Sequence, residues 1–403
     1  MNCAIGLGFG MSDSEAFDLP RMIDGLARLV AFDTQNPPGR ELEAAQWLKA
    51  AMADMGFAAD TTDIMPGRSN VVGVLANGTG PTFALNTHID VVPAGSGWTS
   101  DPFVLRESGG RLYGRGACDA KGSMTAMLEA MRWMAQNRKR WSGTLLGVFV
   151  ADEEVSSRGA KAYAATRPKI DACMIGEPTS CTTYSAHKGS LRPLVRVHGR
   201  AAHSGMPDLG LNAIIKSASL LRAVAAEHQR IRAIQHPLVG NPSLTITRAQ
   251  AGVADNVVPD CCELLLDRRI NPGEDEDVVK AEIAALVARA AEEAGTAMEI
   301  AEFRPTTGGA TETADNQPIV VASQDACRQH HGHWTALSGF QGGCDLVHFR
   351  SVGAQGVVLG PGALDVAHKP DEHVPIADLA MAAAIYRDVA LAMLGGGRTP
   401  YLA

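Results

Sequence analysis

The strongest constraint on the fold is a set of short apolar segments that each end in acidic or histidine residues. Residues 82–85, 144–150 and 172–176 have the composition of buried strands, and the segment from Lys121 between them has the apolar spacing of a helix. Continuous apolar strands that alternate with helices predict a mainly parallel sheet covered on both faces. Ligands of such sheets bind outside the carboxyl ends of the strands, so the polar residues at these ends are candidate functional residues.

Imidazole and carboxylate side chains gather at that edge of the predicted sheet. They are His88, Asp90, Asp119, Glu153, Glu154, Glu177 and His368. Nitrogen and oxygen donors suit a metal such as zinc, and if five of these residues are ligands, one carboxylate can bridge two ions about 3.5–4 Å apart. Adjacent Glu153 and Glu154 point in different directions, so one can bind metal while the other acts as general base.

Each of these features also has a purely structural interpretation. Asp90 lies on the same side of an extended chain as His88 and could hold its imidazole tautomer, but a His-x-Asp sequence is more often structural. A Glu-Glu pair is common on surfaces, and Asp119 could be a helix cap. Core packing gives no reason to gather charge at strand ends, so their joint placement favours a functional site.

The middle of the chain, from about residue 191 to residue 303, has a different order of predicted strands and helices. Its strands and helices follow the order β-α-β-β-α-β, which is the ferredoxin-like pattern, and the α/β pattern resumes after Arg304. We therefore expect a catalytic domain formed by residues 1–186 and 305–403, with a smaller domain inserted at residues 187–304.

Composition excludes several classes of function. The chain has 36 Lys and Arg against 44 Asp and Glu, a net charge of −8, which disfavours a nucleic-acid partner. No apolar run is long enough to span a membrane, and the segment MNCAIGLGFG lacks the basic region of an export signal. Either Met1 or Met11 is the true start. The eight cysteines form no C-x-x-C pair, so we expect reduced thiols in a cytoplasmic protein. No strand precedes GLGFG, and no G-x-S-x-G is present, which disfavours a dinucleotide-binding or serine-hydrolase site.

Six segments together carry a family resemblance: NTHIDVVP, DPF, LYGRGACDAKG, ADEEVSSRGA, GEPT and AHKPDEH. Their order and sequence resemble the M20 metallopeptidase family, within it the group of acetylornithine deacetylases, succinyl-diaminopimelate desuccinylases and aminoacylases. The resemblance implies a zinc-peptidase-like mixed sheet flanked by helices, with a ferredoxin-like lid and dimerisation domain inserted. It also implies two divalent metal ions, zinc by default with cobalt or manganese as alternatives.

The resemblance assigns roles to individual residues. The implied metal ligands are His88, Asp119, Glu154, Glu177 and His368, with Asp119 bridging, while Glu153 is the general base and Asp90 the partner of His88. In the lid, His203 is implied to stabilise the oxyanion in a neighbouring subunit's site, and Asn256 and Arg269 to contact a substrate carboxylate. Gly342 and Gly343 match a glycine loop that lines the pocket. The structural alternatives are a solvated loop histidine for His203 and an ordinary strand-surface pair for Arg268 and Arg269.

Two departures from the family pattern concern the pocket rather than the ligands. Cys344 follows the paired glycines where threonine is usual, and Ala120 follows the bridging aspartate where methionine or aspartate is usual. The segment YSAHKGSL lacks the paired arginines of desuccinylases and resembles the acetylornithine deacetylase version.

These observations favour a homodimeric, metal-dependent amidohydrolase that cleaves the amide bond of a small N-acyl amino acid bearing a carboxylate. A hydrolase of another carboxylate-bearing or aromatic amide or amine is the first alternative. A non-catalytic dimeric binding protein on the same scaffold is the second. The presence of both Glu153 and a complete ligand set favours an enzyme, since a binding protein has no need of both.

Overall fold

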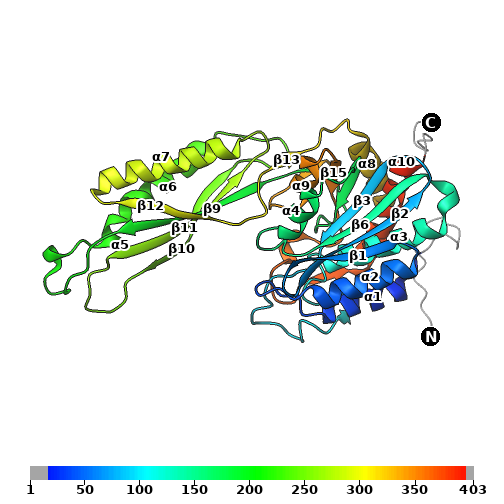
Figure 1. Cartoon of the computed structure of the whole chain (residues 1–403), viewed down its shortest axis with the longest axis horizontal. Helices are drawn as coiled ribbons and strands as arrows, with labels where there is room; N and C mark the ends of the chain where they lie inside the picture. Colours follow the sequence, from blue (N-terminus) through cyan, green and yellow to red (C-terminus); the bar gives the residue numbers. More distant parts are fainter. Residues whose placement is uncertain (1–16, 396–403) are drawn as a thin grey trace.

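The computed structural model describes residues 17–395, so the N-terminal segment discussed above, with Met1, Met11 and GLGFG, lies outside the described residues. Figure 1 shows two bodies, a large α/β part that contains both described ends and an elongated sheet with helices on one side.

The large part is built on a nine-stranded mixed sheet. Eight strands follow the order β1-β2-β6-β3-β7-β15-β8-β13, and β14 pairs with β8. Their bounds are β1 Ala58–Met65, β2 Arg68–Asn77, β3 Thr82–His88, β6 Gly143–Val150, β7 Ala172–Ile175, β8 Tyr184–His187, β13 Thr311–Glu312, β14 Ser338–Phe340 and β15 Gln355–Val358. The four central strands β6, β3, β7 and β15 are parallel, whereas β1, β2 and β13 pair antiparallel. The mixed sheet of the predicted fold class is confirmed, with parallel pairing among the four central strands and between β8 and β14.

Helices cover both faces of this sheet, as the apolar strands predict. One face packs against α1 Leu19–Ala31, α2 Leu42–Asp54, α3 Lys121–Gln136, α8 Pro318–His331 and α10 Ile376–Leu394, and the other against α4 Arg158–Ala165 and α9 Leu346–Ser351. Alternate strand residues point to opposite faces, so in β3 Phe83 and Leu85 join the first core and Ala84 joins the second. Burial on both faces explains why these strands are apolar throughout.

The elongated part is a four-stranded antiparallel sheet in the order β10-β11-β9-β12. It contains β9 Gly189–His198, α5 Ala213–Lys216, α6 Ala218–Ile231, β10 Ser243–Ala251, β11 Cys261–Ile270, α7 Glu276–Ala294 and β12 Met298–Arg304. Its core joins the sheet to α6 and α7. The element order is the predicted β-α-β-β-α-β pattern, with the first helix divided at Ser217, and the domain limits 187 and 304 remain predictions.

A small third sheet was not anticipated. It joins β4 Arg106–Ser108 and β5 Arg111–Tyr113 to β16 His373–Pro375, which brings the C-terminal histidine motif beside the glycine-rich segment of Asp119. Within residues 17–395, no helix combines the length and apolar character needed to cross a membrane. The seven cysteines in this part of the chain are unpaired, and six of them are buried, as expected for reduced thiols.

Candidate metal and catalytic site

The ends of the central strands bring the predicted ligands together. His88 ends β3, Glu154 follows β6, Glu177 follows β7, and Asp119 lies just before α3. Asp119 lies between two imidazoles, because its two carboxylate oxygens are 3.1 Å from His88 Nε2 and 3.2 Å from His368 Nε2. His368 Nε2 is also 3.2 Å from Glu154 Oε2, and His88 Nε2 is 3.9 Å from Glu177 Oε1. All five predicted ligands therefore meet in one cluster, with the proposed bridging residue at its centre.

The donor set fits divalent metal ions. Ligand atoms of His88, Glu153 and Glu177 lie within 4.8 Å of one another, as do those of His88, Asp119 and Glu154. Burial raises the pKa of the Glu177 and Glu153 carboxyls well above their usual range and also raises the pKa of Glu154. Carboxylates buried side by side are unfavourable unless a cation neutralises them, and nitrogen–oxygen sets of this kind suit zinc and related metals. The residues present could thus hold metal ions, with Asp119 placed to bridge two.

The backbone at His368 adopts an unusual conformation. His368 has a φ of +61°, a left-handed conformation that costs energy for a residue with a Cβ atom. Hydrogen bonding to Asp119 raises the pKa of His368 to about 11, so without metal its imidazole acts as a cation among the carboxylates. A divalent ion would take over that role and leave the imidazole neutral as a ligand.

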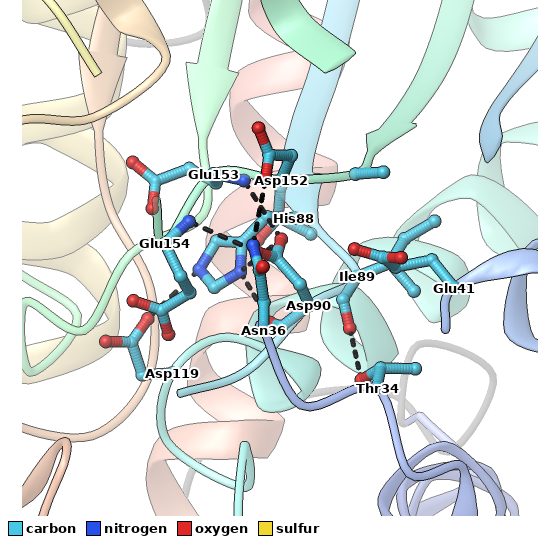
Figure 2. A network of polar contacts seen from close by, with 12 residues as sticks. Thr34, Asn36, Glu41, His88, Ile89, Asp90, Asp119, Asp152, Glu153 and Glu154 are labelled. Carbon is cyan, nitrogen blue, oxygen red and sulfur yellow. Dashed lines mark hydrogen bonds and ion pairs between the residues drawn. The ribbon is translucent and has the colours of Figure 1, made fainter. Parts of the chain in front are cut away.

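Asp90 acts differently from the expectation. The Nδ1 atom of His88 lies 2.8 Å from the backbone carbonyl of Asp90, whereas the nearer carboxylate oxygen of Asp90 is 3.7 Å away. The carboxylate instead accepts hydrogen bonds from the backbone amides of Glu153, at 3.0 Å, and Glu154, at 3.2 Å (Figure 2). The carbonyl orients the His88 ring with Nε2 toward the cluster, so the carboxylate of Asp90 is free to hold the Glu153–Glu154 turn.

That turn sends the two glutamates in different directions. Figure 2 shows the Glu154 side chain beside Asp119 and the Glu153 carboxylate directed away from it. Glu153 is buried, and the Thr307 hydroxyl donates to its Oε1 over 3.4 Å. Glu154 Oε1 accepts from the backbone amide of Val92 at 3.2 Å. The arrangement leaves Glu153 beside the cluster with few fixed partners, as a proton acceptor requires.

Sequence reasoning missed the group that holds the Asp119 loop. The backbone amides of Cys118 and Asp119 both donate to Glu372 Oε1 at 2.9 Å, and the other Glu372 oxygen pairs with the buried Arg115. Glu372 is within the AHKPDEH motif, so the motif was visible but the role of this acidic residue was not.

The glycine loop lies against the same region. A Cβ atom on Gly343 would be 3.0 Å from the Cβ atom of Thr307, the residue that contacts Glu153, and one on Gly342 would be 3.0 Å from the Phe340 ring. The neighbouring Asp345, which was not anticipated, is fully buried, and burial raises its pKa to about 6. The structure thus brings Gly343 near the base, while contact of either glycine with substrate remains a prediction.

The three predicted lid residues lie outside the cluster. His203 is exposed, and its backbone forms an isolated β-bridge with Val257. The backbone amide of Ser204 donates to the Asn256 carbonyl at 2.9 Å, so His203 and Asn256 are neighbours. Arg269 forms an ion pair with Asp267 on its own strand, at 2.7 Å. Among residues 17–395, no hydrogen bond or ion pair joins these three side chains to the carboxylate–histidine cluster.

Comparisons with known proteins identify the family. Residues 84–392 match the profile of peptidase family M20/M25/M40. An acetylornithine deacetylase from Vibrio atlanticus is 31% identical over 336 residues, covering 81% of this chain and 84% of the relative, and one from Salmonella arizonae is 32% identical over 330 residues, covering 80% and 83%.

Solved structures show the same fold at lower identity. An M20 family metallo-carboxypeptidase from Sulfolobus solfataricus superposes with a TM-score of 0.75 at 18% identity, covering 92% of this chain and 98% of that one. A Bacillus subtilis M20 peptidase that binds a dinuclear metal centre has a TM-score of 0.70 at 17% identity, covering 93% and 98%. The matched span contains the whole cluster, from His88 to His368, and the predicted family is confirmed. The chain is a hydrolase that belongs to peptidase family M20/M25/M40.

Proposed function

We propose that this protein is a dinuclear metal-dependent amidohydrolase that removes the acyl group from an N-acyl amino acid, as an acetylornithine deacetylase does. The observation that carries the proposal is the position of Asp119 between His88 and His368, beside a turn that separates Glu153 from Glu154. The curated acetylornithine deacetylases at about 30% identity support the N-acyl amino acid as substrate class.

The proposed ligands are His88, Asp119, Glu154, Glu177 and His368. Two divalent ions held there would supply Lewis acidity, which lowers the pKa of a water molecule and polarises the amide carbonyl. Glu153 takes a proton from the attacking water and transfers it to the departing amine. Burial raises the pKa of the Glu153 carboxyl in the metal-free protein, and a raised pKa strengthens its carboxylate as the acceptor of the water proton.

Substrate contacts from the lid complete the proposal. His203 would donate to the developing oxyanion of a partner subunit, because it lies outside the cluster of its own chain. Asn256, next to His203, and Arg269 would bind the substrate carboxylate, and an arginine suits that contact because it can donate two parallel hydrogen bonds. Gly342 and Gly343 would line the pocket.

A homodimer formed through the lid would bring His203 to the metal site of the partner subunit. The lid exposes large apolar side chains at Met206, Leu209 and Ile215, with 57%, 65% and 69% of their surface accessible. Apolar surface of this kind marks an interface when it is contiguous. We propose that the dimer acts in the cytoplasm on small amides.

Release of amine from a panel of substrates tests the function. The panel contains N-acetyl, N-succinyl, N-formyl and N-aroyl amino acids, incubated with protein that has been chelated and then reconstituted with zinc, cobalt or manganese. We expect metal-dependent turnover of N-acetyl substrates above N-succinyl ones. Turnover of aroyl or other amides alone would support the alternative substrate class, and no turnover by protein with bound metal would contradict the proposal.

A further inference from the structure

A buried polar network lies behind the Glu153–Glu154 turn, on the side away from the proposed metal ions. Its centre is Arg68, which is only 4% exposed and forms a two-point ion pair with the fully buried Glu41. The same guanidinium donates to Asp152 Oδ1 at 2.8 Å and lies 4.0 Å from Asp90. Gly39 is required beside it, because a Cβ atom there would lie 2.2 Å from Arg68 Nε.

Asn36 connects this network to the catalytic turn. Its amide nitrogen donates to Asp90 Oδ2 at 2.8 Å and to Asp152 Oδ1 at 3.0 Å (Figure 2). Its amide oxygen accepts a hydrogen bond from Arg68 at 3.3 Å. Asn36 is 4% exposed, and its own backbone amide donates to the Val91 carbonyl at 2.8 Å. The amide nitrogen of Asn36 therefore links the two carboxylates, while its amide oxygen binds the guanidinium of Arg68.

The carboxylates of Asp90 and Asp152 each accept hydrogen bonds from the segment of residues 153–156. Asp90 accepts the amides of Glu153 and Glu154, as described above, while Asp152 immediately precedes the turn and binds the Ser156 hydroxyl. Without the Asn36 amide, Asp90 Oδ2 would lose its donor at 2.8 Å and Asp152 Oδ1 would keep only Arg68, so the Asp90 carboxylate would lose the contact that ties it to Asp152.

We propose that Asn36 is a positioning residue for the general base, acting through Asp90. Asn36 keeps the Asp90 carboxylate under the two amides, and Asp90 keeps Glu153 directed to the substrate and Glu154 to the metal. The proposal rests on the proposed function for its kinetic consequence. Asn36, Glu41 and Arg68 all precede residue 84, where the match to the family profile begins.

The test compares Asn36→Leu, which keeps the side-chain volume and removes the donors, with Asn36→Ser, a smaller change that guards against loss of folding. Asn271→Leu is the matched control, because Asn271 is also buried, its side chain donates one hydrogen bond to the Gly240 carbonyl, and it directly follows β11 without a hydrogen bond to the Glu153–Glu154 turn in the described chain. We measure kcat, KM, metal content, and hydrogen–deuterium exchange of residues 150–157 in each protein.

Both Asn36 variants should lose about 10- to 100-fold in kcat, with KM within about twofold of the parent and full metal content, while Asn271→Leu keeps its kcat. Both should also speed exchange of the Glu153 and Glu154 amides, a readout that does not depend on activity. Unchanged exchange, or an equal kcat loss in Asn271→Leu, would overturn the proposal. Wild-type protein without turnover but with faster exchange in the variants would contradict the proposed function and still support the role of Asn36.

Discussion

Matched glutamine substitutions at Glu153 and Glu154 give the sharpest test of how the two adjacent carboxylates divide their roles. Loss of a positioned general base costs about 10²- to 10⁴-fold in rate, equivalent to about 2.7–5.5 kcal/mol of barrier. Glu153→Gln should therefore lower kcat by this factor and keep its metal content. Glu154 lies 3.2 Å from His368, so Glu154→Gln should instead lose metal affinity.

The stability of the metal-free variants follows from the same contacts. The hydrogen-bond donor to Glu153 in the described chain is the Thr307 hydroxyl at 3.4 Å, and a glutamine oxygen can accept it equally well. Burial raises the pKa of Glu153, and the neighbouring carboxylates Asp345 and Glu154 raise it further, so removal of the charge relieves repulsion. Metal-free Glu153→Gln should unfold at the same temperature as the parent or higher.

Steady-state kinetics, metal analysis and thermal unfolding of both variants check these expectations. Wild-type turnover in Glu153→Gln would remove Glu153 from the role of base. Equal metal loss in the two variants would show that Glu153 is a ligand, which its distance of less than 4.8 Å from His88 and Glu177 also permits geometrically.

Three further substitutions test the contact of Thr307 with Glu153, the buried ion pair of Arg115 with Glu372, and the burial of His187. Thr307→Val should lower kcat about tenfold with metal retained, since it removes the donor to Glu153, and Thr307→Ser should restore the rate; equal rates in both variants would contradict this contact. Arg115→Met leaves Glu372 buried without its cation and should cost about 3–5 kcal/mol of unfolding free energy, measured by urea denaturation. Burial lowers the pKa of His187 to about 4 from 6.5, so the unfolded chain binds this proton more tightly and stability should fall as pH drops from about 6.5 toward 4, by up to about 3 kcal/mol. In chelated protein, His187→Gln should reduce that acid-induced fall in the urea midpoint, and an unchanged fall would refute the burial argument.

The features that could be predicted from the sequence are those with a local signature. Strands β3, β6 and β7 are apolar throughout because both of their faces are buried, and each is followed directly by the polar residues of the cluster. The β-α-β-β-α-β order of the inserted part was equally clear, because its strands are 7 to 10 residues long and α6 and α7 have 14 and 19 residues. The antiparallel edge strand β1 was missed, since its solvent-facing residues interrupt the apolar pattern.

The residue pairs that hold the site in place have no local sequence signature. Asn36 and Asp90 are 54 residues apart, and Arg115 and Glu372 are 257 residues apart, so neither pair forms a motif that a single sequence can reveal. The contact of Asp90 with His88 is made by the backbone carbonyl rather than by the side chain, for a related reason. Two residues apart on an extended chain, their side chains share a side, but the amides of a turn formed 63 residues later compete successfully for the carboxylate.

This competition explains how two adjacent glutamates can point in different directions. Consecutive side chains diverge only if the backbone between them is fixed, and here one carboxylate fixes it by accepting both amides of the turn. A carboxylate that accepts amide hydrogen bonds is itself mobile unless its other lone pairs are occupied, and Asn36 occupies one of them while Arg68 supplies the nearby positive charge. The position of Glu153 therefore depends on Asn36, in the connection between α1 and α2, and on Arg68, at the start of β2, neither of which is among the proposed metal ligands or substrate-binding residues.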